Sequence, residues 1–349
     1  MKIYWALYPV ALLYGCAVRL RNKCFDWGIL HEQRFATPVI CIGNLTVGGT
    51  GKTPHCEYLI RLLSSQGKVA VLSRGYKRKS KGFVLADSQT AMSQIGDEPY
   101  QMKQKFPETI VAVDANRREG IQHLEKLHPD VILLDDAYQH RYVKARLNLL
   151  LTDFNRLMTR DQMLPAGRLR EPLAGKNRAD IILVTKCPSS ITPEQREEIR
   201  KEIQPANHQT VYFSTFVYED LQRVFEEAAS LSLNQISKED SVLLLTGIAN
   251  PEPLANEIRQ YTANITSLAY PDHHNFTVED MKQIVQAYQL QAAKGKCWVI
   301  TTEKDATRLT SLNEWDDELK KAMWKLPIKV RILEGKEKEF NDSICKELK

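Results

Sequence analysis

The feature that most constrains this chain is a glycine-rich loop between a predicted strand and a predicted helix. Residues 39–42 form an apolar run typical of a buried strand, and the sequence continues as GNLTVGGTGKTP before a helical pattern begins. Glycines in such a loop let backbone N–H groups turn toward phosphate oxygens, and the following helix presents the positive end of its dipole. Strand, loop and helix together predict a nucleotide-binding site of the P-loop type.

The residues that close this loop suggest individual roles. The Lys52 ammonium would reach the β- and γ-phosphates of a triphosphate, and the Thr53 hydroxyl would bind Mg²⁺. We expect four loop residues to surround the phosphates: Gly48, Gly49, Thr50 and Gly51. The general pattern G-x-x-x-x-G-K-[ST] has glycine where this chain has Thr46, so the prediction depends on the later glycines. A plain glycine turn is the alternative.

Length and composition are those of an ordinary soluble protein that is large enough for two domains. The chain has 349 residues and a formal net charge of +5. It contains no long run of Lys and Arg, so no nucleic-acid partner is expected, and an acidic substrate or an anionic lipid surface accounts for the charge. The seven cysteines are scattered without a C-x-x-C pair, which favours reduced thiols over disulfides or a zinc site.

The N-terminal segment is apolar but short. Residues 3–18 carry no formal charge, and the cations Arg19, Arg21 and Lys23 follow. A helix of that length spans roughly 24 Å, which is less than the roughly 30 Å hydrocarbon core of a bilayer. Its aromatic rings and the trailing cations suit the headgroup region of an anionic membrane. We therefore predict that residues 1–24 form a helix that lies on a membrane. A buried core helix and an export signal are the alternatives.

Strand and helix patterns alternate along the next part of the chain. Helices are predicted over 55–66 and 117–127, and buried strands over 69–73, 109–113, 131–136, 147–153 and 179–186. Continuous apolar runs of this kind indicate a parallel sheet that helices cover on both faces. The following segment, 188–240, is polar, with helical stretches near 193–203 and 219–230, and we place a domain boundary near residue 205.

A second alternation follows this boundary. Strands are predicted over 241–247, 264–270 and 297–305, with a helix over 278–292. The expected fold is therefore α/β. It combines a membrane-associating helix, a P-loop domain with a parallel sheet over 25–205, and a smaller α/β domain over 206–349.

An aspartate pair ends one of the buried strands. Asp135 and Asp136 follow the apolar run of VILLDD, so their carboxylates would lie at the strand's C-terminal end, beside the P-loop. Carboxylates in that place hold Mg²⁺ directly or through water. A solvated Asp-Asp turn is the alternative for either residue alone.

Two positions bear on the class of nucleotide-binding protein. A guanine-specific protein is expected to show Asn-Lys-x-Asp after a late strand, whereas this chain has Thr-Lys-Cys-Pro at 185–188, which favours ATP. A class of switch ATPases has a signature lysine where this chain has Val47. That difference weakens, without excluding, a partner-regulated ATPase.

Eight motifs in this order extend over nearly the whole chain and resemble the tetraacyldisaccharide 4′-kinase family of lipid A biosynthesis. They are GNLTVGGTGKTP, SRGYKR, GDEP, LLDDAYQH, LPAGRLREP, TGIANP, PDHHNF and TTEKDA. The first of them includes Thr46, which is therefore no irregularity within this family. The chain departs from the family pattern where Ala137-Tyr138 replaces Gly-Leu and where Arg168 replaces a frequent proline.

This resemblance implies a phosphotransferase that uses ATP and Mg²⁺. The acceptor would be the 4′-hydroxyl of an acylated glucosamine disaccharide 1-phosphate, with Asp97 as the base that accepts its proton and His273 as the partner of Asp97. On the metal side the resemblance points to Thr53, Asp135, Asp136 and Glu171, and on the substrate side to Arg74, Arg170 and His274. For the two histidines a cap on the following helix is the alternative, since Thr277 and Asp280 have the pattern of a helix start.

The implied substrate also bears on location. Its acyl chains leave a bilayer only at a cost of roughly 0.8 kcal/mol per CH₂ group, so the enzyme has to reach the membrane. Because ATP is required, we expect it on the cytoplasmic face of the bacterial inner membrane. A soluble small-molecule kinase and a partner-regulated switch ATPase remain the alternatives.

Overall fold

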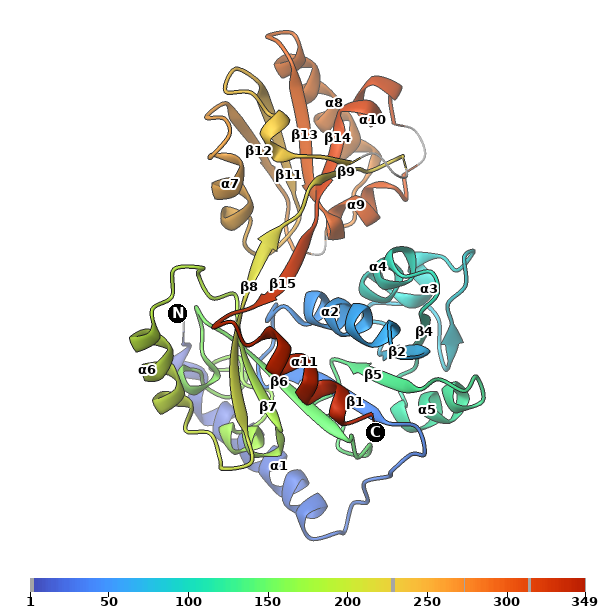
Figure 1. Cartoon of the computed structure of the whole chain (residues 1–349), viewed down its shortest axis with the longest axis vertical. Helices are drawn as coiled ribbons and strands as arrows, with labels where there is room; N and C mark the ends of the chain where they lie inside the picture. The colour runs from blue at the N-terminus through green and yellow to red at the C-terminus, as the bar shows by residue number, and fades with distance from the viewer. Residues whose placement is uncertain (1–2, 227–229, 273, 313–314, 349) are drawn as a thin grey trace. The chain divides into compact units, whose positions relative to one another are not determined.

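The chain forms two units (Figure 1) in a computed structural model that describes residues 3–226, 230–272, 274–312 and 315–348. Unit 1 comprises Met1–Phe216 and Val330–Lys349, and unit 2 comprises Val217–Lys329. The chain therefore leaves unit 1 in strand β8 (Thr210–Tyr218) and returns to it in strand β15 (Ile328–Ile332). This division differs from the expected boundary near residue 205, because β8 and the last residues of the chain belong to unit 1.

Unit 1 is built on a nine-stranded sheet with the order β15-β8-β7-β6-β1-β5-β2-β4-β3. The strands from β8 to β4 pair in parallel, and β3 pairs antiparallel with β4. The remaining bounds are β1 Val39–Asn44, β2 Val69–Ser73, β3 Val84–Leu85, β4 Ile110–Val113, β5 Val131–Asp135, β6 Leu147–Asp153 and β7 Ile181–Thr185. Strand β1 lies between β5 and β6, so the residues that follow it emerge in the middle of the sheet edge.

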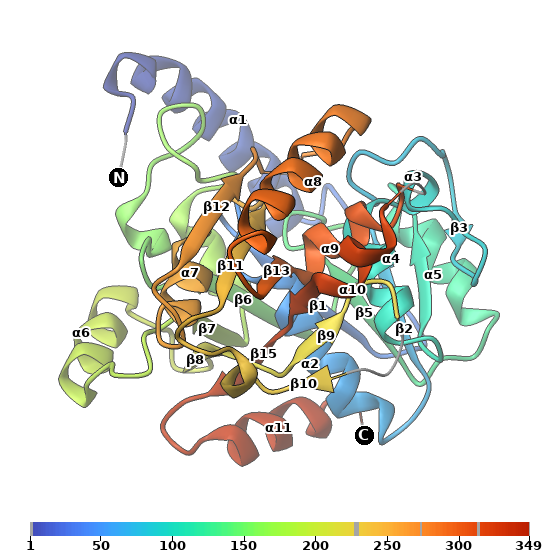
Figure 2. The same cartoon turned by 90° about the horizontal axis from the view of Figure 1, so that it is seen from above.

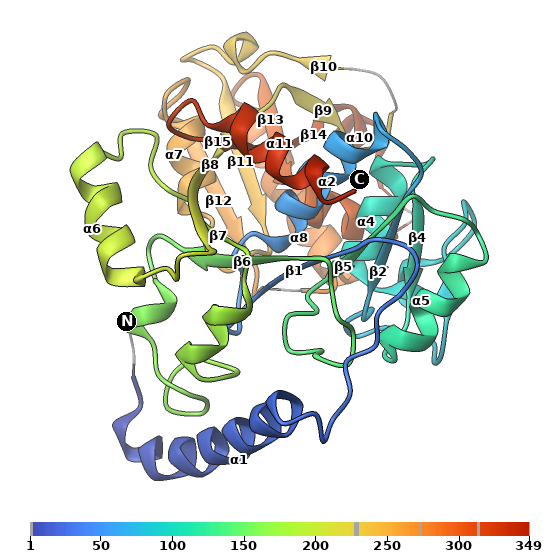
Figure 3. The same ribbon diagram turned by 60° about the horizontal axis from the view of Figure 1, so that its bottom comes forward.

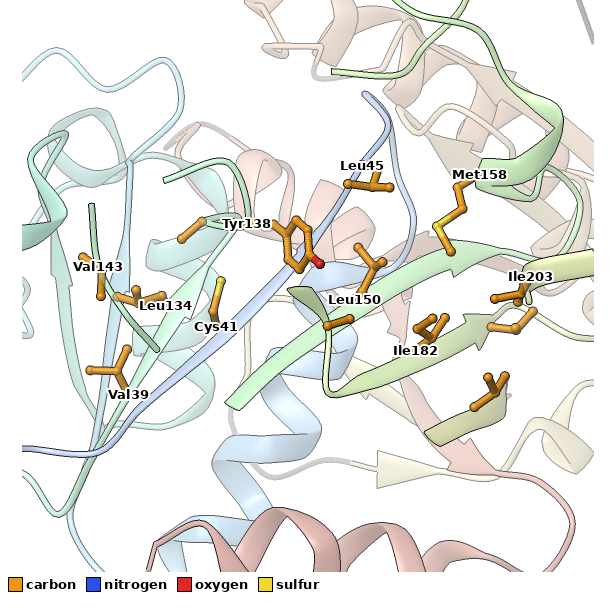
Figure 4. Close-up of a cluster of buried hydrophobic side chains, with 14 of the residues drawn as sticks. Val39, Cys41, Leu45, Leu134, Tyr138, Val143, Leu150, Met158, Ile182 and Ile203 are labelled. Atoms are coloured by element: carbon orange, nitrogen blue, oxygen red, sulfur yellow. The ribbon is translucent and has the colours of Figure 1, made fainter. Parts of the chain in front are cut away.

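Helices cover both faces of this sheet, as the continuous apolar runs predict. One face packs against α2 (Lys52–Ser64), α4 (Asp97–Lys105) and α11 (Glu337–Lys346). The other packs against α5 (Arg117–Glu125), α6 (Pro193–Ile203) and the segment 137–179, which contains the short helices η2 (Met158–Arg160) and η3 (Leu173–Arg178). Figure 4 shows this second core, in which Cys41, Leu150 and Ile182 of neighbouring strands face Tyr138. A one-turn helix, α3 (Met92–Ile95), precedes α4.

The N-terminal segment is helical, as predicted. A short turn, η1 (Trp5–Leu7), leads into α1 (Tyr8–Asp26), the long blue helix of Figure 3. Three residues of α1 are buried, namely Ala11, Gly15 and Phe25. Hydrogen bonds tie the helix to segment 137–179, one of them from the Tyr14 hydroxyl to the Arg170 carbonyl at 2.8 Å. Within the described ranges no helix is both long enough and apolar enough to span a bilayer.

Unit 2 is a smaller α/β layer structure on a six-stranded sheet with the order β10-β9-β14-β13-β11-β12. Four strands are parallel: β11 Ser241–Thr246, β12 Ile265–Ala269, β13 Cys297–Thr302 and β14 Met323–Leu326. Helix α7 (Glu252–Ile258) covers one face, with η4 (Leu233–Gln235) beside it. The other face packs against α8 (Val278–Ala292), α9 (Glu303–Leu309) and α10 (Asp317–Ala322), which Figure 2 shows to the right of β11 and β12, with α7 on their left.

The α/β fold class is confirmed, but two predicted elements of unit 2 are wrong. In place of a helix over 219–230 the chain forms the short strands β9 (Leu221–Arg223) and β10 (Ser230–Leu231). Leu221 is fully buried there, and β9 pairs with β14, so pairing at the sheet edge overrides the local helical pattern. The strand predicted over 297–305 ends at Thr302, whose hydroxyl accepts a hydrogen bond from the Asp305 N–H at 3.1 Å and caps α9.

Candidate functional site

The P-loop lies where β1 reaches the edge of the sheet and turns into α2. Gly48 and Gly51 have φ values of 109° and 84°, in the left-handed region that favours glycine. Lys52 is the first residue of α2, and no side chain caps the free N–H groups at this helix start. An uncapped helix N-terminus behind a glycine loop is suited to bind phosphate oxygens. The loop therefore has the conformation that its sequence predicts.

Side chains from neighbouring strands hold the back of the P-loop. The Asn44 amide donates to the Thr50 hydroxyl at 2.8 Å, and the Thr185 hydroxyl donates to the Thr50 carbonyl at 2.8 Å. The Lys186 ammonium donates to the Gly49 carbonyl and, at 2.8 Å, to the Asp153 carboxylate. Thr50 is only 4% exposed, so its side chain faces the protein interior. The Thr50 N–H also donates within the loop, to the Gly48 carbonyl at 3.0 Å, so Thr50 holds the shape of the P-loop.

Asp136 joins the two cations of the site. Its Oδ1 lies 3.7 Å from the Lys52 ammonium, and the Arg170 guanidinium binds both of its oxygens, at 2.8 and 3.3 Å. Arg170 also donates to the side chain and the carbonyl of Asn44. Burial favours the neutral form of Asp136, but the charges of Lys52 and Arg170 outweigh it and hold the pKa below its ordinary value. Arg170 therefore connects Asp136 to Asn44, the last residue of β1 before the P-loop.

Asp135 is the more deeply buried carboxylate, with 1% exposure. The Ser73 hydroxyl donates to its Oδ2 at 3.4 Å, whereas its Oδ1 is buried without a hydrogen-bond partner. Burial, followed by the nearby charges of Glu98 and Asp136, raises the pKa of Asp135 to about 7. A cation beside Oδ1 would satisfy this atom and stabilise its charge, so the carboxylate fits a site for Mg²⁺.

The side chains that the structure describes do not form a metal site by themselves. In the described part of the chain, no three or more His, Cys, Asp or Glu side chains gather as metal ligands. Glu171 is surrounded by donors: Arg178 binds its two oxygens at 2.9 and 3.0 Å, and the Gln139 amide donates at 3.0 Å. The Asn22 amide of α1 donates to it at 3.2 Å. Through these contacts Glu171 links α1 to segment 137–179. A metal role for Glu171 stays a prediction.

The residues predicted to act on the acceptor lie in both units. Asp97 is the first residue of α4, directly after Gly96, whose φ is 89°. The charge of Glu98, the next residue, acts on Asp135, so the first turn of α4 lies close to the end of β5. His273 lies outside the described residues. The His274 ring stacks on Tyr270 and its Nε2 lies 2.8 Å from Asp280, which also caps α8, as the capping alternative predicts.

A group of cations gathers beside the ends of β2 and β5. Arg74 follows β2 and is exposed, and Arg117 is buried at the start of α5, where it donates to the Asp114 carbonyl at 2.5 Å. Burial lowers the pKa of Arg117 to about 10, although Asp135 and Asp136 act in the opposite direction. Burial also lowers the pKa of His140 to about 4, with the charge of Arg117 as the next cause. Several positive charges therefore act on His140, those of Arg117, Arg118 and Arg74 among them.

Four residues near the P-loop were not expected from the sequence. Asn44 and Lys186 hold the loop as described, Glu98 acts on Asp135, and His55 is buried one turn into α2. Burial lowers the pKa of His55 to about 4. Asn44 and Glu98 lie within motifs, His55 directly follows one and Lys186 adjoins none, so only their position after folding distinguishes them from neighbouring polar residues.

The tyrosine that departs from the family motif has a structural explanation. Tyr138 is 4% exposed, and its hydroxyl donates to the Gly175 carbonyl at 2.8 Å. The Arg178 guanidinium lies 4.7 Å from the centre of its ring. A Cβ on Gly43 of β1 would lie 2.7 Å from the Cβ of Tyr138, so the close approach requires glycine there.

Known proteins match this chain along its length. A family model described as tetraacyldisaccharide-1-P 4′-kinase matches residues 3–349. A tetraacyldisaccharide 4′-kinase of Phocaeicola vulgatus is 51% identical over 348 residues, which cover 99% of this chain and 95% of the relative. One of Flavobacterium johnsoniae is 46% identical, with 98% and 96% covered. A crystal structure of the "apo" form of LpxK from Aquifex aeolicus in complex with ATP has a TM-score of 0.75 and 28% identity, and covers 99% of both chains.

Proposed function

Because the chain belongs to the tetraacyldisaccharide-1-P 4′-kinase family, we propose that it transfers the γ-phosphate of ATP to the 4′-hydroxyl of a tetraacyl glucosamine disaccharide 1-phosphate. The observation that carries this proposal is the match of the whole chain together with an intact phosphate site, in which Lys52 begins α2 beside Asp136. The whole-chain match favours this activity over a soluble small-molecule kinase or a switch ATPase.

The reaction forms a bond between the 4′-oxygen and the γ-phosphorus and breaks the bond from that phosphorus to the β–γ bridging oxygen, which leaves with ADP. Such a transfer mainly requires alignment and neutralisation of the phosphate charge. Lys52 would neutralise the β- and γ-phosphates, and the backbone of the P-loop would hold them. Asp97 would accept the proton of the 4′-hydroxyl, a role supported by its place in the first turn of α4, near β5.

The buried aspartates and Thr53 would hold Mg²⁺ at this site. The unpartnered Oδ1 of Asp135 and its raised pKa support a cation there, and Asp136 lies within the same group of charges. When bound, Mg²⁺ would neutralise charge on the β- and γ-phosphate oxygens. Arg74, with Arg117 and Arg118 nearby, would bind a phosphate of the lipid substrate, since guanidinium groups suit phosphate oxygens.

Helix α1 would bring this site to the membrane. It carries exposed apolar residues, including Leu13 at 73% and Leu20 at 60%, beside several cations. Burial of such residues in lipid is favourable, and the cations suit anionic headgroups. We place the enzyme on the cytoplasmic face of the bacterial inner membrane, where ATP meets the lipid.

One assay tests the proposed reaction. The protein is incubated with Mg²⁺, γ-labelled ATP and a tetraacyl disaccharide 1-phosphate in detergent, and the lipid is extracted. We expect a labelled lipid that carries a second phosphate, and no product from the Lys52→Ala variant. Label transferred only to a water-soluble sugar would favour a soluble small-molecule kinase. Release of labelled phosphate only when a protein partner is added would favour a switch ATPase.

A further inference from the structure

His55 is a buried side chain for which the proposed reaction has no role. It is 2% exposed and lies three residues after Lys52 in α2. Its Nδ1 lies 2.7 Å from the Gly51 carbonyl oxygen, and its Nε2 lies 2.9 Å from the Ser214 hydroxyl oxygen. A carbonyl oxygen only accepts hydrogen bonds, so Nδ1 carries the proton and donates it, and Nε2 accepts from Ser214. Both ring nitrogens are thus satisfied.

The Gly51 carbonyl, which accepts the hydrogen bond from His55 Nδ1, lies at the junction between the P-loop and α2. The Gly51 carbonyl and the Lys52 N–H belong to one planar trans peptide, in which they point in opposite directions. A donor that fixes the carbonyl therefore also fixes the direction of the Lys52 N–H. That N–H lies at the uncapped start of α2, where phosphate would bind. The same carbonyl also accepts the His55 backbone N–H at 3.3 Å.

Strand β8 supports the other side of the imidazole. Ser214 and Phe216 are two residues apart on β8, so their side chains lie on one face of the strand. The Phe216 ring lies 5.9 Å from the His55 ring, and its Cζ is 2.7 Å from the place that a Cβ on Gly51 would take. Two neighbouring side chains of β8 therefore contact the same loop junction.

We infer that His55 is a positioning residue that holds the Gly51–Lys52 peptide in its phosphate-binding orientation, and that Ser214 of β8 holds His55. The inference rests on the proposed function in one respect, because it takes the P-loop ligand to be ATP. It assigns β8 a role in nucleotide affinity, although β8 is separated from β1 by two strands of the sheet.

The test removes the donor and then restores it. His55→Phe keeps a planar ring but has no donor, and we expect the Kd for ATP with Mg²⁺ and the KM for ATP to rise about tenfold, as for the loss of one good hydrogen bond. His55→Asn places an amide N–H close to the position of Nδ1 and should restore most of the affinity. The KM for the lipid acceptor should stay unchanged in both variants.

Two further variants separate positioning from packing. Cys56→Ala is the matched control, since Cys56 is fully buried in the same helix and packs in the core. It should leave ATP affinity unchanged. Ser214→Ala should weaken ATP binding in the wild-type background but have no further effect in His55→Asn, whose shorter side chain does not reach Ser214. Comparison of Ser214→Ala in the wild-type and His55→Asn backgrounds tests the inference even if His55→Phe does not fold.

The outcomes distinguish this inference from the proposed function. Wild-type affinity in both His55→Phe and Ser214→Ala would overturn the inference and leave the kinase proposal intact. Equal losses in the Phe and Asn variants would also overturn it, because they would indicate packing alone. A wild-type protein that binds no ATP would instead overturn the proposed function, and this inference with it.

Discussion

At the scale of single residues, Asp97 can be tested separately from nucleotide binding. Asp97→Ala should lower kcat for phosphoryl transfer by about 10²- to 10⁴-fold, the usual contribution of a general base. The Kd for ATP should remain close to that of the wild type, because Asp97 belongs to α4 and not to the P-loop. Single-turnover transfer and calorimetric ATP titration measure the two quantities.

Asp97→Asn and Glu98→Gln complete this test. The asparagine keeps the volume of the side chain without its basicity, so its rate should be as low as that of alanine. Glu98→Gln removes the neighbouring negative charge that acts on Asp135 while it leaves Asp97 in place, and it should retain most of the activity. Wild-type turnover in Asp97→Asn would remove Asp97 from the mechanism.

The burial of His140 predicts how the free energy of unfolding depends on pH. Its pKa is lowered to about 4 by burial and by neighbouring arginines, compared with about 6.5 in an unfolded chain. Between these values the unfolded state binds more protons, so the free energy of unfolding rises with pH over this window and falls as pH falls through it. His140→Gln should therefore make the decrease in stability between pH 7 and pH 5 smaller, as urea denaturation measures.

Two comparisons make the result specific. Part of the pH dependence should persist in His140→Gln, because burial also lowers the pKa of His55 to about 4. Replacement of an exposed histidine, His31→Gln, should leave the pH dependence of wild type unchanged. An unchanged slope in His140→Gln would contradict the neutral state of His140 in the folded protein.

The sequence predicts residues of this site when they belong to a recognisable local pattern. Lys52, Asp135 and Asp136 lie where a strand end and a glycine loop place them, and both are local features. Lys186, which follows β7, contacts the P-loop, and Ser214 of β8 contacts His55 at the start of α2. Their roles follow from the order of strands in the sheet, which no short pattern encodes.

At the scale of elements, α1 is the part whose role in membrane binding is testable. Leu13 and Leu20 are 73% and 60% exposed, so their replacement removes apolar surface without disturbing the core. The double variant Leu13→Ser/Leu20→Ser should bind anionic phosphatidylglycerol vesicles at least about tenfold more weakly, since each buried leucine contributes about 1.5–3 kcal/mol. Vesicle sedimentation measures this change, and ATP affinity should remain unchanged.

The matched control lies in unit 2. Leu290 of α8 is 61% exposed, and Leu290→Ser should leave vesicle binding unaltered. These substitutions are sharper than deletion of residues 1–24, which would also remove the bonds from Tyr14 to the Arg170 carbonyl and from Asn22 to Glu171. Equal vesicle binding by wild type and the double variant would show that these leucines of α1 do not contribute to membrane binding.

Elements were predictable where the pattern is long and apolar. The buried strands β1, β5 and β7 coincide with continuous apolar runs. Strand β9 does not, because it has three residues and is stabilised by pairing with β14, far along the chain. Short edge strands depend on such tertiary contacts more than on their own sequence.

At the scale of the whole molecule, the stability of unit 1 depends on its last helix. Phe340 of α11 is 1% exposed and packs in the same core as Leu59 and Leu63 of α2. Phe340→Ala should therefore destabilise unit 1 by about 3–5 kcal/mol. Lys338→Ala, an exposed position in the same helix, should have little effect. Urea denaturation with and without ATP measures the change.

A fragment offers a second test of this dependence. Residues 25–205 correspond to the P-loop domain expected from sequence but lack β8 and α11. We expect this fragment to show no cooperative unfolding, since apolar side chains of the sheet would be exposed. A stable, ATP-binding fragment would show that the late segments are dispensable.

The two crossings of the chain, in β8 and β15, have a consequence for biosynthesis. On the ribosome, all of unit 2 is synthesised before the residues from Val330 onward that complete unit 1. Multidomain chains generally fold their N-terminal domain first during synthesis. Here we instead expect unit 2 to fold on the ribosome before unit 1, whose core lacks the apolar side chains of α11 until translation reaches that helix.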